Sequence, residues 1–500
     1  MVSGCPVRAR ARSHPDGLAL VAGDRRWSWA GLDGEVAQMA GSLRAVGVGA
    51  GDRVAVLAAN HPATVMLLFA LRRLGGALVP LNVRLTPAEL RAQHDRVRAR
   101  LLLADADRMG VLAGADSLEG WTRTGAVPVE DSPGDPAADW ALLFTSGTTG
   151  TPKAARLTVG AFDALASASA ENLAPRVGDR WLCNLPLFHV GGLGTAVRCA
   201  HDGASLVLQA RFEADAVVRG VRDDGITHLS LVARTLEQCL DADLQAGALR
   251  GVLVGGGPVP AALVERANER GIPVLLTYGL TEACSQVTTE RPGEADGSTA
   301  GAPLPGLEVR IVDAGFRSLP AGEEGTIAVR GPTLMRGYLD DEAATREVLR
   351  EGWLQTGDLG RLDGRGRLTV LARRTDLILS GGENVYPAEV EAVLATHPAV
   401  AEVAVVGRPD ARWGQVPVAV VVPRGSAAPD ALPGLRAWAR SRLAPFKVPA
   451  EVLPAAELPR TAAGKVDRAA VQAAVTAASG PCSFEKTPAV ESTARRTEFK

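Results

Sequence analysis

The chain has 500 residues, of which 46% are hydrophobic and 22% charged, and its formal net charge at pH 7 is −2. This length is too great for one hydrophobic core and predicts two or more domains. The near-neutral charge argues against a general nucleic-acid-binding protein, which would carry a strong basic excess. No stretch of 18 or more apolar residues occurs, so we expect no membrane partner. The six cysteines are scattered without a C-x-x-C pair, which is typical of reduced thiols in a cytoplasmic protein.

The region up to about residue 130 alternates apolar runs with helical patterns. Residues 53–57 are typical of a strand, residues 64–74 of an amphipathic helix, and residues 75–81 of a turn and a second strand. Strands that alternate with helices predict a mostly parallel α/β sheet covered on both faces. Residues 131–139, rich in Asp, Pro and Ala, are expected to form an exposed connector.

The apolar run 141–144 leads directly into the sequence T-S-G-T-T-G-T-P-K. Glycines let backbone N–H groups approach a ligand, hydroxyls can donate hydrogen bonds, and Lys153 adds positive charge, so the loop suits phosphate oxygens. The spacing is not that of a Walker A loop. A plain Ser/Thr/Gly surface loop is the alternative, but the preceding strand and the closing lysine favour phosphate binding. The candidate binding residues are Thr145, Ser146, Gly147, Thr148, Thr149, Gly150 and Lys153.

This string closely resembles the phosphate loop of the adenylate-forming enzymes, which include acyl- and aryl-CoA ligases, peptide-synthetase adenylation domains and luciferases. One departure is Ala154, where that family usually has Gly. The resemblance extends from about residue 27 to about residue 470. It implies ATP, Mg²⁺ and coenzyme A as cofactors and a small-molecule carboxylic acid as substrate. It also implies a large N-terminal domain of mixed, mostly parallel sheets covered by helices, and a small mobile α+β C-terminal domain.

Further along the chain, residues 226–231, 251–255 and 272–277 are typical of strands and residues 260–270 of a helix. Short strands at 307–312 and 325–330 predict a small antiparallel or barrel-like unit. We therefore expect an adenylation domain over residues 1–372, a hinge over 373–376 and a mobile domain over 377–475. Residues 476–500 are polar and aperiodic, as in a disordered tail.

The string N-L-P-L-F-H-V-G-G at residues 184–192 resembles a substrate-side motif of the family. The resemblance implies that His189 shapes or gates the acyl pocket. A core histidine held by a backbone hydrogen bond is an equally good interpretation of the residue alone.

The string Y-G-L-T-E follows the predicted strand 272–277. A carboxylate at a strand end, in a chain with a phosphate loop, is suited to hold Mg²⁺, although Glu282 taken alone is more often an acid at a helix N-terminus. The string is similar to the family motif Y-G-x-T-E, which implies that Thr281 and Glu282 contact phosphate and metal. The ring of Tyr278, next to Gly279, could stack on a base.

Asp358 follows Thr356 and Gly357 in what we expect to be a turn. Its carboxylate could accept hydrogen bonds from both ribose hydroxyls, or it could simply stabilise the turn. The resemblance to the family's T-G-D motif favours the ribose. Arg373 matches an arginine that contacts the nucleotide, and Thr375 stands at the hinge position, where the family commonly has Asp or Lys.

Two later segments match family motifs as well. Gly381 and Gly382 match the loop that lines the pantetheine tunnel, although a glycine turn between strands is the alternative. Lys465 ends the string P-R-T-A-A-G-K. A lone lysine is usually solvated, but the family lysine here stabilises the charge that gathers on the α-phosphate during adenylation.

Several strings resemble the o-succinylbenzoate–CoA ligase branch of the family, which serves menaquinone biosynthesis; these include T-H-L-S-L-V at residue 227 and Y-G-L-T-E-A-C-S-Q at residue 278. The resemblance implies an acid pocket whose glycines leave a flat slot for an aromatic ring. Its expected residues are His189, Ser230, Gly256, Gly257 and Ser285.

The expected reaction joins the acid to coenzyme A through an acyl-adenylate, with release of AMP and pyrophosphate. Three alternatives stay open: another aryl-CoA ligase of secondary metabolism, an adenylating enzyme that loads a separate carrier protein, and a non-catalytic nucleotide-binding homologue. A homodimer is also left open.

Overall fold

The computed structural model describes residues 4–122, 127–129, 134–145, 152–257, 259, 261–372, 378–385, 387–424, 433–459 and 466–477. Several sequence expectations lie outside these residues: the phosphate-loop residues Ser146, Gly147, Thr148, Thr149 and Gly150, the hinge with Arg373, Lys465, and the tail from residue 478.

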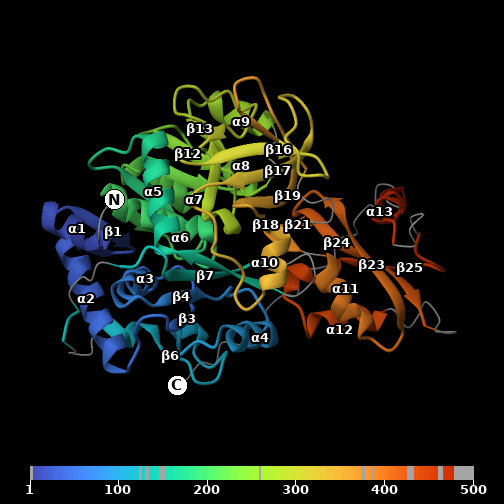
Figure 1. Ribbon diagram of the computed structural model, residues 1–500, viewed down its shortest axis with the longest axis horizontal. Coiled ribbons are helices and arrows are strands. Elements are labelled where there is room, and N and C mark those ends of the chain that lie inside the picture. Colours follow the sequence, from blue (N-terminus) through green and yellow to red (C-terminus); the bar gives the residue numbers. More distant parts are fainter. Residues whose placement is uncertain are drawn as a thin grey trace, which may run out of the picture.

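A six-stranded sheet, in the order β6-β5-β3-β4-β7-β8, forms the lower part of the molecule in Figure 1. Its strands pair in parallel except β7 with β8, which are antiparallel. The predicted strand 53–57 is confirmed, and the predicted helix 64–74 begins two residues earlier, at Pro62. The elements are β3 (Arg53–Leu57), α3 (Pro62–Leu74), β4 (Ala77–Pro80), α4 (Pro87–Val97), β5 (Leu101–Ala104), β6 (Asp116–Ser117), β7 (Asp139–Thr145) and β8 (Lys153–Thr158).

A nine-stranded sheet follows, in the order β15-β14-β13-β12-β11-β9-β10-β1-β2. Its central strands are parallel, and antiparallel strands β2, β14 and β15 lie at its two ends. The strands are β1 (Leu18–Ala22), β2 (Arg25–Ser28), β9 (Arg180–Cys183), β10 (Ser205–Leu208), β11 (His228–Leu231), β12 (Gly251–Val254), β13 (Val274–Leu280), β14 (Ser285–Thr289) and β15 (Ala302–Pro303).

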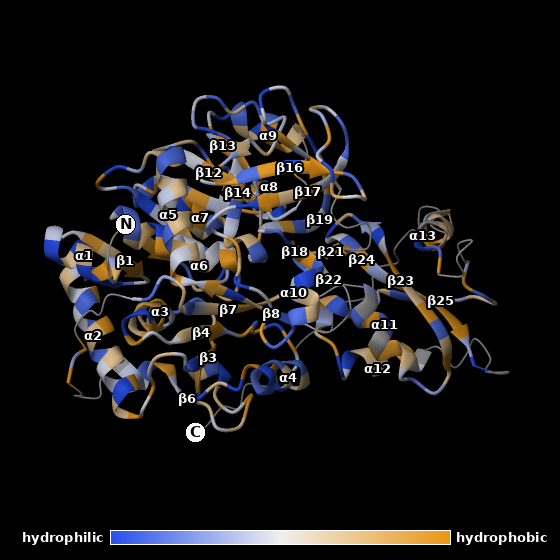
Figure 2. Cartoon of the chain, viewed as in Figure 1, coloured by the Kyte–Doolittle hydropathy of each residue, from blue (hydrophilic) through white to orange (hydrophobic). Residues whose placement is uncertain are grey.

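One continuous hydrophobic core joins these two sheets through α2, α3, α5 and α6, while a second core packs α7, α8 and α9 on the nine-stranded sheet. Figure 2 shows hydrophobic residues along the strands and hydrophilic residues in the peripheral turns, as expected for sheets covered by helices. The helices are α1 (Pro6–Ser13), α2 (Trp29–Ala45), α5 (Val159–Leu173), α6 (Val190–Asp202), α7 (Ala214–Asp223), α8 (Ala233–Asp241) and α9 (Ala261–Asn268). Among the described residues, no helix has both the length and the apolar character to cross a membrane.

The predicted antiparallel unit is a five-stranded sheet made of β16 (Glu308–Val312), β17 (Gly325–Arg330), β18 (Leu349–Arg350), β19 (Trp353–Leu362) and β20 (Leu368–Ala372), with α10 (Glu342–Val348) beside it. The T-G-D string does not form the expected turn, because it lies inside β19. The register of β17 against β19 is interrupted there, and Gly357 has φ +76°. This bulge lets a carboxylate leave the middle of a strand toward the cavity described below.

The C-terminal unit, defined here as the elements from β21 onward, lies beside α10 in orange and red (Figure 1). Its strands pair in the order β22-β21-β24-β23, and β25 adds to β24. The elements are β21 (Ile378–Ser380), β22 (Glu383–Val385), α11 (Pro387–Ala395), β23 (Val400–Asp410), β24 (Gly414–Pro423), α12 (Pro433–Arg440), the 3₁₀ turn η5 (Pro445–Lys447), β25 (Glu451–Pro454) and α13 (Arg468–Ala477). The fold is therefore α/β, with a large sheet-rich N-terminal part and a small C-terminal unit.

Candidate active site

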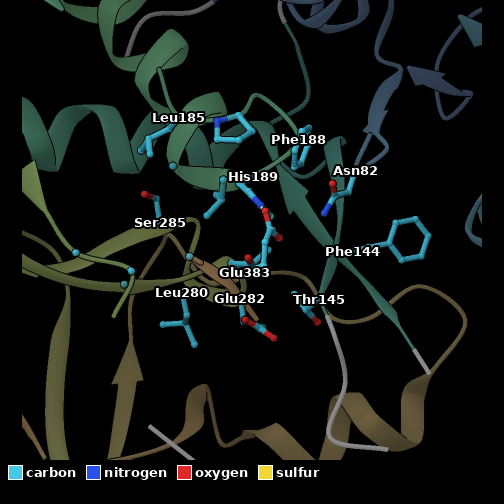
Figure 3. Close-up of a pocket in the computed structure, with 18 of the residues that line it drawn as sticks. Asn82, Phe144, Thr145, Leu185, Phe188, His189, Leu280, Glu282, Ser285 and Glu383 are labelled. Atoms are coloured by element: carbon cyan, nitrogen blue, oxygen red, sulfur yellow. Dashed lines mark ion pairs between the residues drawn. The ribbon is translucent and has the colours of Figure 1, made fainter. Parts of the chain in front are cut away.

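A cavity of about 410 Å³ opens between the two parallel sheets and the C-terminal unit. It lies beyond the carboxyl ends of β11 and β12, the place where open α/β sheets commonly bind ligands. The C-terminal unit closes one side through Gly382, Glu383, Phe446 and Lys447. Figure 3 shows side chains from both parts of the chain around this space.

Most of the described residues that the sequence singled out meet in this cavity. Those that line it are Thr145, Lys153, His189, Ser230, Gly256, Gly279, Thr281, Glu282, Ser285, Asp358 and Gly382. Tyr278, Gly257 and Gly381 lie just behind the wall: Tyr278 bonds to Asp358, and a Cβ on the two glycines would meet Leu379 and Trp413.

Lys153 and Glu282 form the polar corner of the cavity. Lys153 opens β8, and Glu282 lies in the 3₁₀ turn η3 (Thr281–Ala283) that follows β13. Tyr338 joins them: its hydroxyl donates to Glu282 Oε1 at 2.9 Å, and its ring centroid is 5.3 Å from Lys153 Nζ. An ammonium and a carboxylate on one wall suit phosphate oxygens and a hard cation respectively.

Protein side chains in this corner could supply only some of the ligands that Mg²⁺ needs. Among the residues that the structure describes, no group of three His, Cys, Asp or Glu could hold a metal ion. Mg²⁺ typically keeps several waters and binds through one or two carboxylates together with substrate phosphates. Glu282 alone therefore fits an ion that arrives with a nucleotide.

Asp358 forms a second polar position on the cavity wall. The hydroxyl of Tyr278 donates to Asp358 Oδ2 at 2.7 Å, and the backbone N–H of Asp358 donates to Thr356 Oγ1 at 3.1 Å. The carboxylate is thus fixed by β13 and by its own strand. The structure gives Tyr278 this orienting contact, which the sequence did not reveal.

Arg198 carries a positive charge at the inner end of the cavity. It lies on α6 and is 2% exposed, and it donates to Gln286 Oε1 at 2.6 Å and Thr195 Oγ1 at 3.0 Å. Its Nε has no acceptor, and in the described part of the chain no carboxylate lies within ion-pair distance of it. Burial lowers the pKa of Arg198, but a guanidinium remains charged in proteins. A buried cation of this kind, facing a cavity, calls for an anionic ligand.

Trp181 helps to define the shape of this inner end. The guanidinium of Arg198 lies 4.6 Å from the Trp181 ring centroid, and the indole N–H donates to Ser230 Oγ at 3.1 Å. Gly256 follows β12, the strand that pairs with β11, and has φ +77°. Because it lacks a side chain, only backbone faces the cavity at this position.

His189 stands at the start of α6, in the middle of the view in Figure 3, next to Glu383. Its Nε2 is 3.8 Å from Glu383 Oε2, and Arg84 also contacts Glu383. The side chain is 46% exposed and lines the cavity. Burial, with a smaller contribution from Arg84, lowers the pKa of His189 to about 4. The imidazole is therefore neutral at pH 7, and its contact with Glu383 is not an ion pair there.

Sequence reasoning missed Arg198, Tyr338 and Glu383 as cavity residues. An arginine inside the mostly apolar helix sequence V-G-G-L-G-T-A-V-R-C-A is the one signal that could have identified Arg198. No local pattern marked Tyr338.

The comparisons with known proteins agree with this geometry. The family model described as AMP-binding enzyme matches residues 7–339, and the AMP-binding enzyme C-terminal domain matches residues 389–465. The chain is 39% identical over 472 residues to a 2-succinylbenzoate–CoA ligase from Bacillus licheniformis, with 92% of this chain and 98% of that protein covered.

Two solved structures of the o-succinylbenzoate CoA synthetase from Bacillus subtilis are similar to the chain, each 36% identical and covering 93% of it. For a double mutant bound with a product analogue, the TM-score is 0.87 and the match covers 98% of that chain. For the complex with the acyl-adenylate intermediate, the TM-score is 0.72 and the match covers 96% of that chain. At equal identity and equal coverage of this chain, the chain is therefore more similar in structure to the product-analogue complex than to the acyl-adenylate complex.

Proposed function

The chain belongs to the AMP-binding enzyme family, and we propose that it is an ATP-dependent ligase that joins an aromatic dicarboxylic acid, o-succinylbenzoate, to coenzyme A. The reaction consumes ATP and releases AMP and pyrophosphate, with an acyl-adenylate between the two halves. The similarity to 2-succinylbenzoate–CoA ligases over 92% of the chain supports this substrate.

The buried charge of Arg198 is the observation that carries the substrate proposal. o-Succinylbenzoate has two carboxylates, of which only one can react with ATP. The second would remain charged inside the cavity, where an unneutralised guanidinium would receive it in a desolvated, charge-assisted hydrogen bond. A monocarboxylic acid would leave Arg198 without an anion, so the site favours a diacid.

In the first half-reaction the acid carboxylate attacks the α-phosphate of ATP. We assign the phosphates to Thr145, Lys153 and the loop 146–150, and the ribose to Asp358, which Tyr278 orients. Bound Mg²⁺ would supply charge that offsets the phosphate oxygens, with Glu282 holding it and Thr281 contacting the phosphate.

The remaining roles in this half-reaction rest on the family resemblance together with the cavity. Arg373 and Lys465 are assigned to the nucleotide, and Lys465 stabilises the negative charge that develops on the α-phosphate. His189, whose pKa is lowered by burial, is assigned to shaping the acyl pocket. Ser230, Gly256, Gly257 and Ser285 form the slot for the ring.

In the second half-reaction the thiol of coenzyme A displaces AMP. We propose that the C-terminal domain, residues 377–475, turns about the hinge 373–376, so that Lys465 leaves and the Gly381-Gly382 loop faces the cavity. Gly381 and Gly382 both have positive φ, at +59° and +83°, and a Cβ on Gly381 would lie 2.6 Å from the Trp413 ring. Bare backbone is therefore required in this turn between β21 and β22, and its proposed role beside the pantetheine arm rests on the family resemblance.

We also propose that the protein works in the cytoplasm, on small molecules and not on nucleic acid or membranes. No disulfide joins any two of the five cysteines in the described residues, which supports a reducing compartment. Comparing the rate of thioester formation with free coenzyme A and with a carrier-bound pantetheine identifies the acceptor. A homodimer is left open.

The direct test mixes purified protein with o-succinylbenzoate, ATP, Mg²⁺ and coenzyme A and identifies the products by mass. The proposal predicts o-succinylbenzoyl-CoA with one AMP and one pyrophosphate each. Thioester formed only on a carrier protein would favour the carrier-loading alternative instead. ATP binding without any pyrophosphate exchange would favour the non-catalytic alternative.

A further inference from the structure

One buried lysine connects the C-terminal unit to the N-terminal part of the chain. Lys447, in η5, is 5% exposed. Its ammonium donates to Glu389 Oε1 at 2.6 Å, within the C-terminal unit, and to Glu89 Oε1 at 3.0 Å, on α4 of the N-terminal part. The ion pair with Glu89 can exist only while the two parts lie as they do here.

Contacts within the N-terminal part hold Glu89 in place independently of Lys447. Its Oε2 accepts hydrogen bonds from the backbone N–H of Thr86 at 2.9 Å and from the Thr86 hydroxyl at 2.8 Å, as the capping box that begins α4. Its other oxygen is thereby presented to the C-terminal unit. Both partners are largely buried, with side-chain exposures of 6% and 14%, so water screens their attraction only weakly.

The connection lies beside the cavity. Lys447 and Phe446 line it together with Gly382 and Glu383 of the C-terminal unit. A second contact across the same boundary, between Arg84 and Glu383, lies on the chain just before α4. The segment 84–89 therefore contacts the C-terminal unit at two points and fixes how the glycine loop faces the cavity.

We propose that Glu89 and Lys447 are positioning residues for the thioester-forming half-reaction, an inference that rests on the proposed function. Their ion pair stabilises the arrangement in which the Gly381-Gly382 loop borders the cavity. Its overall similarity to the product-analogue complex of the Bacillus subtilis synthetase, at a TM-score of 0.87 against 0.72 for the acyl-adenylate complex, supports this assignment. Because the proposed turn about the hinge moves the C-terminal unit relative to α4, we expect this pair to be absent from the adenylating arrangement.

An interaction present in one of two states shifts the equilibrium by its own free energy. Removing it lowers the population that can transfer the acyl group, but it leaves the adenylating state intact. Glu89→Gln is the sharpest variant, because Glu89 does not line the cavity and Lys447 keeps Glu389 as a partner. The lysine is therefore not left as an unpaired buried charge.

The test measures the two half-reactions separately in the full-length protein. Pyrophosphate exchange reports adenylation, and single-turnover mixing of preformed acyl-adenylate with coenzyme A reports transfer. For Glu89→Gln we expect transfer to fall about tenfold while exchange is unchanged or faster. Glu89→Asp, which keeps the charge, recovers part of the loss. Asp95→Asn removes an exposed carboxylate from the same helix, 70% exposed, and should alter neither rate.

The outcomes separate this inference from the function on which it rests. If the wild-type protein performs both halves and Glu89→Gln lowers them equally, or lowers neither, the inference is overturned. An equal loss with a lower melting temperature would mean that Glu89 acts only as a helix cap. If the wild-type protein performs no exchange with any acid, the proposed function itself fails.

Discussion

The hydroxyl of Tyr278 donates a hydrogen bond to Asp358 Oδ2 at 2.7 Å, across 80 positions of the chain. The contact ties the end of β13 to the bulge of β19 and fixes the carboxylate that we assign to the ribose. It connects two sequence motifs whose relationship neither motif shows by itself.

Tyr278→Phe therefore tests the ribose assignment. A hydrogen bond to a charged group contributes about 1.5–3 kcal/mol, so we expect the KM for ATP to rise roughly tenfold or more, with little change in kcat. Tyr338→Phe is the matched control, since it removes a hydroxyl bonded to Glu282 instead. If both variants change the same constant by the same factor, Asp358 has no separate role in ATP binding.

Glu282→Gln tests the cation position. Loss of a preorganised charge at a phosphoryl-transfer site typically lowers the rate 10²- to 10³-fold, and we expect a loss of about this size in pyrophosphate exchange. Excess Mg²⁺ should restore part of it. Glu347→Gln, another carboxylate that lines the cavity, is the control and should leave the Mg²⁺ requirement as it is. Equal effects of the two variants would contradict the assignment.

Arg198→Met tests recognition of the second carboxylate. Truncating one partner of a buried charge pair costs about 2–5 kcal/mol, so kcat/KM for o-succinylbenzoate should fall at least about 30-fold. The matched ligand is 4-oxo-4-phenylbutanoate, which lacks only the ring carboxylate, and its kcat/KM should hardly change. A parallel loss with both acids would show that Arg198 shapes the pocket without reading the charge.

The unliganded stability of the same variant gives an independent check. Arg198 is buried without a carboxylate partner in the described residues, and burying an unpaired charge costs free energy that an apolar side chain does not. We expect the melting temperature of Arg198→Met to equal or exceed that of the wild type. A large drop would mean that the hydrogen bonds to Gln286 and Thr195 dominate.

Lys465→Ala separates the two half-reactions. The ammonium is assigned to the charge that develops on the α-phosphate, so its loss should abolish pyrophosphate exchange. Thioester formation from supplied acyl-adenylate should continue, because we propose that Lys465 leaves the site before that step. If both halves are lost equally, the two-state account is wrong.

His228 predicts an acid-sensitive stability. Burial is the main cause that lowers its pKa to about 4, and the ring stacks on Trp181. Between pH 6.5 and 4 the unfolded histidine binds a proton that the folded one does not, so stability is present above pH 6.5 and is lost as the pH falls. In His228→Gln the slope of unfolding free energy with pH should be smaller by up to about 1.4 kcal/mol per pH unit in this window. An unchanged slope would contradict the lowered pKa.

The alternation of strands and helices was predictable because it depends on local periodicity. The strand 53–57 and the helix that follows it are found within two residues of their predicted bounds. The T-G-D segment was wrongly expected to be a turn, because its place inside β19 is set by pairing with β17 about 30 residues earlier. Local sequence contains no information on that pairing.

The cavity residues divide in the same way. Glu282 and Asp358 follow glycines in recognisable strings, and both line the cavity. Arg198 belongs to no string. Its significance comes from tertiary packing. Because α6 packs near β14, Gln286 contacts Arg198, while among the described residues no carboxylate pairs with it. A missing partner is a tertiary property, and sequence reasoning could not supply it.

The central claim is that this cavity adenylates an aromatic diacid, and pyrophosphate exchange against a small acid panel tests it most directly. The panel contains o-succinylbenzoate, 4-oxo-4-phenylbutanoate, benzoate, salicylate, a hydroxynaphthoate and a medium-chain fatty acid. We predict exchange with o-succinylbenzoate far above that with every other acid. Equal exchange with 4-oxo-4-phenylbutanoate, or exchange confined to the fatty acid, would contradict the account.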